Sequence, residues 1–106
     1  MYSVPIWMSD DVRRKLAEKH NVDEEEVRQC FANLEGVFLR DTREEHRTDP
    51  PTYWFISETN RRRILKVCFV SCRAETKCGV VVRTDIKSAF PPNDQEIAIW
   101  ERHGKC

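Results

Sequence analysis

Hydrophobic positions near the start of the chain recur with helical spacing. Ser9 has a side chain suited to an N-cap, and Asp10 and Asp11 favour the positive end of a helix that would end at Asn21. The apolar face of this helix consists of Val12, Leu16 and Ala17.

A second helix is predicted directly after the first. Asp23 and Glu26 have the spacing of a capping-box pair, and Gly36 is expected to close the helix. Its apolar residues recur at i, i+3, i+4 and i+7, as Val27, Cys30, Phe31 and Leu34. Because the two helices are joined by only a few residues, we expect them to form a hairpin.

The pattern then changes to the two-residue period of β-strands. Residues 41–51 are polar and end in Pro-Pro, which predicts a loop, and Thr59-Asn60 predicts a turn. The strands expected are residues 37–39, 53–58, 63–71 and 80–86.

A last helix is predicted over residues 95–102, capped by Asn93 or Asp94, with Ile97 and Trp100 facing the sheet. The order of elements predicts one α+β domain spanning residues 1–106. In it, an N-terminal helical pair packs on an antiparallel sheet in two layers, and a helix closes the chain.

Composition narrows the function classes. The chain has 106 residues, is 34% charged and carries 18 basic and 18 acidic residues, so bulk charge does not indicate nucleic-acid binding. The five cysteines are odd in number and irregularly spaced, which favours a reduced, cytoplasmic protein over a disulfide scaffold. We expect no membrane span and no signal peptide.

Charged residues gather between positions 41 and 66, where strands begin and meet. His46 titrates near neutrality and can move a proton, although a solvated loop histidine is the alternative. Glu58 can act as a general base, or form a cross-strand ion pair with Arg61 or Arg63. Arg61, Arg62 and Arg63 can clamp phosphate, or protect a strand edge by charge.

Further candidates lie on the strands. Lys66 interrupts an apolar alternation and can share a face with Arg62, and Arg83 interrupts a run of valines. Tyr53 and Trp54 can stack on bases, but core packing is their default interpretation.

Metal binding is not favoured by the cysteine spacing. Four residues are conceivable zinc ligands, namely Cys72, Cys78, His103 and Cys106. Their spacing contains no Cys-x-x-Cys pair, so we predict no metal and no cofactor.

Three segments of the chain resemble the BrnT-type toxins, a branch of the RelE-like ribonuclease toxins. Residues 18–22 (Glu-Lys-His-Asn-Val), followed by the acidic start of the second helix, resemble the family's Lys-His-Gly-Val-x-x-x-Glu-Ala. Residues 61–67 resemble its Gly-Arg-Leu-Leu-x-Val turn and strand, and residues 88–100 resemble its last connection and helix. Ile6-Trp7 stands where the family has a strand with Phe-x-Trp-Asp.

The resemblance implies a RelE-like fold and a toxin held inactive by an antitoxin from the neighbouring gene. It also implies metal-independent cleavage of RNA, by attack of the ribose 2′-hydroxyl on the adjacent phosphate. RNA and a second copy of the chain are further partner hypotheses, and the alternative function is a non-enzymatic binding module. The residues assigned to catalysis are His46, Glu58, Arg62 and Arg83, and those assigned to phosphate binding are Arg61, Arg63 and Lys66.

Overall fold

The structure is a computed structural model that describes residues 6–40, 51–77 and 79–104, with the backbone alone for 72–76 and 80–82. Its first helix, α1 (Asp10–Lys15), is capped by Ser9, whose Oγ accepts a hydrogen bond from the Val12 N–H at 3.2 Å. The chain continues as a π-helix, η1 (Leu16–His20), and stops at Asn21, whose φ of 52° is left-handed. Asparagine tolerates this conformation better than most residues, so the predicted end is confirmed.

The second helix, α2 (Glu24–Ala32), has the predicted capping box. The Glu26 N–H donates to Asp23 Oδ1 at 2.8 Å, and the Asp23 N–H donates to Glu26 Oε1 at 3.3 Å. The helix ends at Ala32, before the predicted Gly36. The Asn33 side chain instead donates to the Glu58 carbonyl at 2.9 Å, which ties the end of α2 to the sheet.

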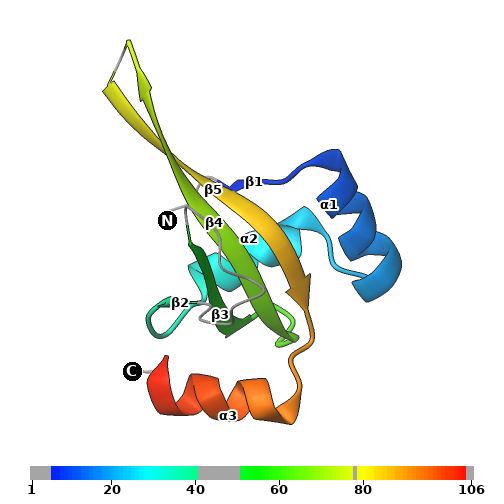
Figure 1. Cartoon of the computed structure of the whole chain (residues 1–106). Coiled ribbons are helices and arrows are strands. Elements are labelled where there is room, and N and C mark those ends of the chain that lie inside the picture. The colour runs from blue at the N-terminus through cyan, green and yellow to red at the C-terminus, as the bar shows by residue number, and fades with distance from the viewer. Residues whose placement is uncertain (1–5, 41–50, 78, 105–106) are drawn as a thin grey trace.

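Five strands form one mixed sheet in the order β1-β5-β4-β3-β2 (Figure 1). They are β1 (Ile6–Trp7), β2 (Leu39–Arg40), β3 (Thr52–Glu58), β4 (Ile64–Thr76) and β5 (Gly79–Phe90). Neighbours from β2 to β5 are antiparallel, whereas β1 runs parallel to β5 through the Ile6–Thr84 and Trp7–Asp85 pairs. The α+β class is therefore confirmed, and β1 adds a parallel pair to the predicted antiparallel sheet.

Strands β4 and β5 are longer than predicted and together form an arm that extends past the rest of the sheet (Figure 1). The register shifts between Cys68 and Phe69, where β5 contains one extra residue and forms a β-bulge. The bulge places both Ile86 and Ala89 opposite core residues of β4, and the two are 1% and 0% exposed.

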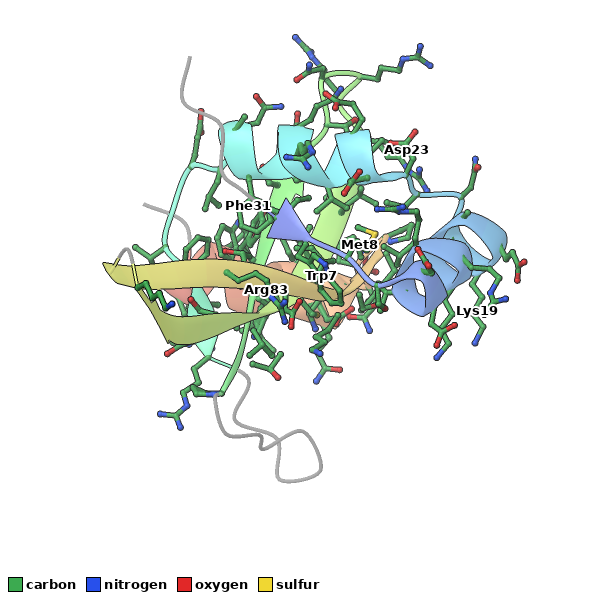
Figure 2. All side chains as sticks on the ribbon, turned by 90° about the horizontal axis from the view of Figure 1, so that it is seen from above. Trp7, Met8, Lys19, Asp23, Phe31 and Arg83 are labelled. Atoms are coloured by element: carbon green, nitrogen blue, oxygen red, sulfur yellow. The ribbon has the colours of Figure 1, made fainter. Side chains whose placement is uncertain are left out.

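Helix α2 covers one face of the sheet with an aromatic cluster. The Phe31 ring lies 4.7 Å from the Phe55 ring and 5.5 Å from the Phe69 ring, measured between centroids. Figure 2 shows Phe31 projecting from α2 toward the strands. Segments α1 and η1 pack against β5, and buried Leu16 and Val22 join the same core.

The last helix, α3 (Asp94–His103), lies on the opposite face. Asn93 caps it through a second capping box with Glu96, and Trp100 is buried, as predicted. The Trp100 ring lies 6.3 Å from the ring of Trp54, which is adjacent to Phe55 in β3 and so points to the other face. Helix α3 therefore adds a layer that the predicted two-layer arrangement did not include. In the described part of the chain, none of the helices is long and apolar enough to cross a membrane.

The connection between α2 and β2 is held against the end of α3. The Val37 N–H donates to the Gly104 carbonyl at 2.9 Å. Gly36, with a φ of 152°, comes so close that an added Cβ would lie 2.3 Å from the Gly104 oxygen. Only glycine fits there, because a side chain would meet backbone and the conformation is strained for other residues. The two segments therefore stay side by side.

Candidate functional site

The arginine-rich turn between β3 and β4 has a defined hairpin geometry. The Arg62 N–H donates to the Thr59 carbonyl, and the Thr59 N–H donates to the Arg63 carbonyl, both at 2.9 Å. Arg62 has a φ of 63°, the left-handed position of a three-residue hairpin loop that glycine usually occupies. Arg61 and Arg62 are exposed at this tip. The predicted turn is therefore present, with a strained residue in it.

Arg63 is used to hold the fold together. Its Nη1 donates to the Asn21 carbonyl at 2.6 Å and to Glu26 Oε2 at 3.1 Å, and its Nη2 donates to the His20 carbonyl at 2.6 Å. Its guanidinium is thus bound by the carbonyls of the last residue of η1 and of its C-cap, and by a carboxylate of α2. Its ion-pair partner is Glu26, not the Glu58 considered from sequence.

Lys66 is likewise committed to the interior. The residue is 5% exposed, and its Nζ lies 2.5 Å from Glu96 Oε2 of α3. The Nζ also lies over the Trp54 ring at 4.7 Å and near the Phe90 ring at 5.6 Å. A buried charge needs such a partner, so this lysine joins α3 to the sheet.

Arg83 stands apart from the turn. Its guanidinium lies 4.4 Å from the Trp7 ring centroid and 3.2 Å from Asp85 Oδ2 (Figure 2). Arg83 pairs with Cys72 of β4, and Cys72 lies eight residues along β4 from Ile64, the residue at the turn. At about 3.3 Å per residue, Arg83 is therefore roughly 26 Å from the turn. Arg83 and the turn arginines therefore cannot hold one phosphate together.

Of the residues assigned to catalysis from sequence, the structure leaves Glu58 and Arg62 at one end of the sheet, next to Arg61. His46 lies outside the described residues. The side chains of Cys72, Cys78 and Cys106 also fall outside them, and no group of three or more acidic, His or Cys side chains among the described residues could hold a metal. Tyr53 stacks on Phe69, with centroids 6.0 Å apart, in agreement with core packing.

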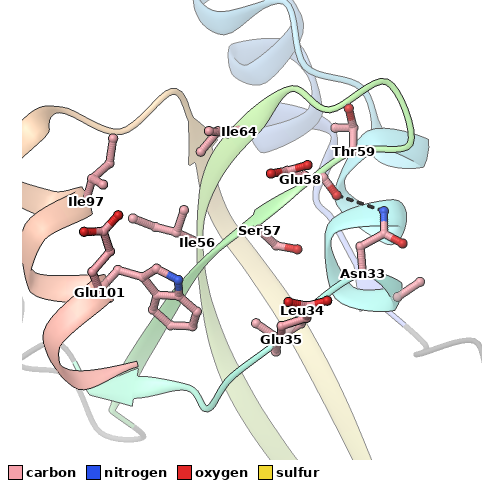
Figure 3. Close-up of a pocket in the computed structure, with 12 residues that line it drawn as sticks. Asn33, Leu34, Glu35, Ile56, Ser57, Glu58, Thr59, Ile64, Ile97 and Glu101 are labelled. Carbon is pink, nitrogen blue, oxygen red and sulfur yellow. Dashed lines mark hydrogen bonds between the residues drawn. The ribbon is translucent and has the colours of Figure 1, made fainter. Parts of the chain in front are cut away.

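A groove of about 710 Å³ opens beside Glu58, between the end of α2 and helix α3 (Figure 3). One wall comes from α3, with Ile97, Trp100 and Glu101, and the other from the end of α2, with Asn33, Leu34 and Glu35. Strand β3 forms the floor between the walls, and its lining residues are Ile56, Ser57, Glu58 and Thr59.

The floor of this groove is a sheet edge that β2 does not cover. Strand β2 pairs with β3 only at Tyr53 and Trp54. The Thr59 N–H donates to the Arg63 carbonyl, on the β4 side of the strand. Because the backbone groups of successive strand residues point to opposite sides, those of Ile56 and Glu58 point outward, away from β4. The Glu58 carbonyl accepts its bond from Asn33 on this outer side. Between Ile56 and Glu58, no strand in the described part of the chain pairs with this edge.

The groove combines an apolar interior with an acidic rim. Ile56 and Trp100 are buried, and Ile64 of β4 is 44% exposed beside them. Around them lie the exposed glutamates Glu35, Glu58 and Glu101, and the described lining residues include no lysine or arginine. An apolar strip beside an open strand edge suits a polypeptide, whereas the acidic rim would repel a phosphate chain.

The sequence analysis did not identify this groove. Its glutamates are far apart in the chain, at positions 35, 58 and 101, so no local sequence motif indicates that they share a site. One signal was available, because the strand predicted at 37–39 is too short to cover the strand predicted at 53–58. That mismatch in length already indicates an open edge.

The thiol of Cys30, on α2, is buried and unreactive. Burial, with a smaller contribution from Glu26 and an opposing one from Arg63, raises its pKa from 9.0 to about 12. A thiol this rarely ionised is a poor nucleophile, so it belongs to the core.

Comparison with known proteins gives no relative from which a role can be transferred. No protein-family model matches this sequence, and neither a curated protein nor a solved structure matches it.

Proposed function

We propose that this chain is a binding module that takes an extended segment of a partner polypeptide into the groove between α2 and α3. The observation that carries the proposal is the uncovered edge of β3 at Ile56 and Glu58, which forms the floor of the groove. An added strand bonds to such an edge through its backbone and sends alternate side chains to the two walls.

The proposal is supported by what the structure does with the predicted cations. Arg63 and Lys66, two of the residues assigned to phosphate, are bound to Glu26 and Glu96. These two cations are therefore engaged and not free to hold phosphate. In the groove, the Glu58 carbonyl is bound to Asn33, while the backbone groups of Ile56 and the Glu58 N–H point outward beside the apolar surface.

The test compares Glu58→Pro with Glu58→Ala. Both variants lose the carboxylate, but only proline also removes the outward N–H, and the β3–β4 bonds stay intact because that N–H faces away from β4. The probes are three fluorescein-labelled nonapeptides that alternate valine with lysine, serine or glutamate. We expect at least one to bind the wild type, and to bind Glu58→Pro at least about tenfold more weakly than Glu58→Ala.

Amide chemical shifts of the wild type locate the contact. Shifts at Ile56 and Glu58 on addition of peptide are expected, because their backbone groups form the edge. If none of the three peptides binds, the proposed function is wrong. If binding is equal in the two Glu58 variants, the segment does not add to the strand edge.

We keep metal-independent RNA cleavage by a BrnT-like toxin as a second candidate. Its support is the exposure of Arg61 and Arg62 in the hairpin turn that follows Glu58, three and four residues further along the chain. Under this candidate the partner is an antitoxin from the neighbouring gene, and His46 remains an untested acid or base.

An RNA-cleavage assay in excess chelator tests this candidate. Loss of one essential group by Glu58→Gln, Arg62→Ala or His46→Ala is expected to lower the rate about 100-fold, while Lys19→Ala on the exposed side of η1 serves as the control. Equal rates in all variants, or activity that chelator abolishes, would exclude the mechanism.

A further inference from the structure

We infer that the segment bound in the groove is cationic, with lysine or arginine side chains alternating with apolar ones along an extended strand. This inference rests on the proposed function and adds the chemistry of the partner. Its basis is the distribution of charge around the strand edge, together with a buried hydroxyl in the floor of the groove.

No ion pair among the described residues neutralises the rim carboxylates. Arginines and lysines elsewhere in the described chain pair with other acids, such as Arg63 with Glu26 and Lys66 with Glu96. None of the ion pairs formed among the described residues uses the three carboxylates of the rim, Glu35, Glu58 and Glu101. Three like charges around one groove attract a ligand of opposite sign.

The positions of these carboxylates match the geometry of an added strand. Successive side chains of a strand point to opposite faces, so in an alternating segment the cationic side chains would meet one wall and the apolar side chains the other. Each wall supplies one glutamate, Glu101 on α3 and Glu35 after α2, while Glu58 lies in the floor between them (Figure 3). Each wall also supplies an apolar side chain, Trp100 on α3 and Leu34 after α2, so one wall can receive the cationic set while the other receives the apolar set.

Ser57 provides an independent indication of a polar ligand. Its side chain belongs to the groove lining and points toward the end of α2 (Figure 3). The residue is 8% exposed, and its Oγ has no hydrogen-bond partner among the described residues. Buried hydroxyls normally have a partner, and a donor group of a bound segment would supply one.

The experiment measures binding of the lysine, serine and glutamate nonapeptides by fluorescence anisotropy. We expect the lysine peptide to bind the wild type about tenfold or more tightly than the glutamate peptide, with the difference shrinking as salt rises from about 0.05 M to about 0.5 M. The Glu35→Gln/Glu101→Gln variant should bind the lysine peptide roughly threefold to thirtyfold more weakly.

The matched control is Glu18→Gln/Glu25→Gln, which removes the same charge from exposed positions on η1 and α2. It should keep the wild-type affinity, and circular dichroism of both variants checks that they are folded.

The outcomes separate this inference from the function on which it rests. If the three peptides bind equally well and Glu58→Pro weakens them all relative to Glu58→Ala, the groove binds strands but the cationic preference is wrong. If the affinity for the lysine peptide falls to the same extent in the rim and control variants, the attraction is not located at the groove and the inference is overturned. If none of the peptides binds, the proposed function itself has failed.

Discussion

The two faces of the sheet are built from different chemistry. On the α2 face, Phe31, Phe55 and Phe69 pack ring against ring and need no polar partner. On the α3 face, the indole of Trp54 covers a buried ammonium group, and the Lys66–Glu96 pair joins helix to strand. The interior of the first face is held by ring packing, and its Arg63–Glu26 pair is only partly buried, whereas the second face has a charge pair in its interior. We therefore expect the first face to carry more of the stability.

The largest effect expected is from Phe55→Ala. Phe55 is 0% exposed, and truncating a phenylalanine in a packed core costs about 3–5 kcal/mol. Its neighbour Trp54 points to the other face, and Trp54→Ala should cost less because it also lets water reach the charge of Lys66. Urea unfolding of the two variants measures both values. Equal losses of the free energy of unfolding would contradict the expected difference between the two faces.

Next in size is the charge pair of the α3 face. Glu96→Gln keeps a side chain able to form the capping box but leaves the buried Lys66 charge without its carboxylate, at a cost of about 2–3 kcal/mol. Adding Lys66→Met should recover most of this loss, because the unpaired charge is removed. Asp11→Asn, in the exposed Arg14–Asp11 pair, should change the free energy of unfolding by less than about 1 kcal/mol. If Lys66→Met does not restore stability, the unpaired Lys66 charge is not the cause of the loss in Glu96→Gln.

Cys30 gives the α2 face a pH dependence. Its pKa is raised to about 12 by burial, so the folded thiol stays protonated at pH values where the unfolded thiol ionises. Its contribution is complete below pH 9.0 and is lost as the pH rises from there toward about 12, at up to about 1.4 kcal/mol per pH unit. Denaturation of wild type and Cys30→Val at pH 8 and at pH 10 measures the difference. Parallel pH profiles would contradict the assignment.

The smallest effect expected comes from the β3–β4 turn, which belongs to neither face. Arg62 holds a left-handed φ of 63°, so Arg62→Gly should stabilise the fold by up to about 1 kcal/mol. Arg61→Gly is the control, because Arg61 is not among the described residues with positive φ and glycine there only adds freedom to the unfolded chain. Thermal unfolding distinguishes the two, and a destabilised Arg62→Gly would mean that its side chain supports the turn.

Local signals predicted the elements of the fold well. The capping box of α2, the cap of α3 at Asn93 and the stop at Asn21 depend on residues within a few positions of one another, and the structure contains them all. The β3–β4 turn is also present, centred on Asn60 and Arg61, one residue later than predicted. Boundaries that depend on distant contacts were missed. Helix α2 stops at Ala32, where the Asn33 side chain donates to the Glu58 carbonyl, and β5 extends to Phe90, which pairs with Lys66 of β4.

The candidate site was predictable only in part. The charged turn was expected, but the sequence could not show that Arg63 would meet the carbonyls of His20 and Asn21, or that Lys66 would meet Glu96. The ends of these contacts are separated by 30 to 43 positions in the chain. A charge pattern therefore identifies candidates, and packing decides which remain accessible.

By itself, the sequence determined the helices, the main strands, the α+β class and most of the apolar faces, because periodicity and capping act over a few residues. It did not predict β1, and Ala17, which was assigned to an apolar face, is exposed. Only the tertiary structure decided that α3 covers the second face, and that Arg63 and Lys66 are bound to carboxylates of the helices. These outcomes bring together residues such as Glu35, Glu58 and Glu101, which share a groove only when the chain folds. The physical reason is that long-range packing and burial, which no local pattern encodes, select which polar groups remain unpaired at the surface.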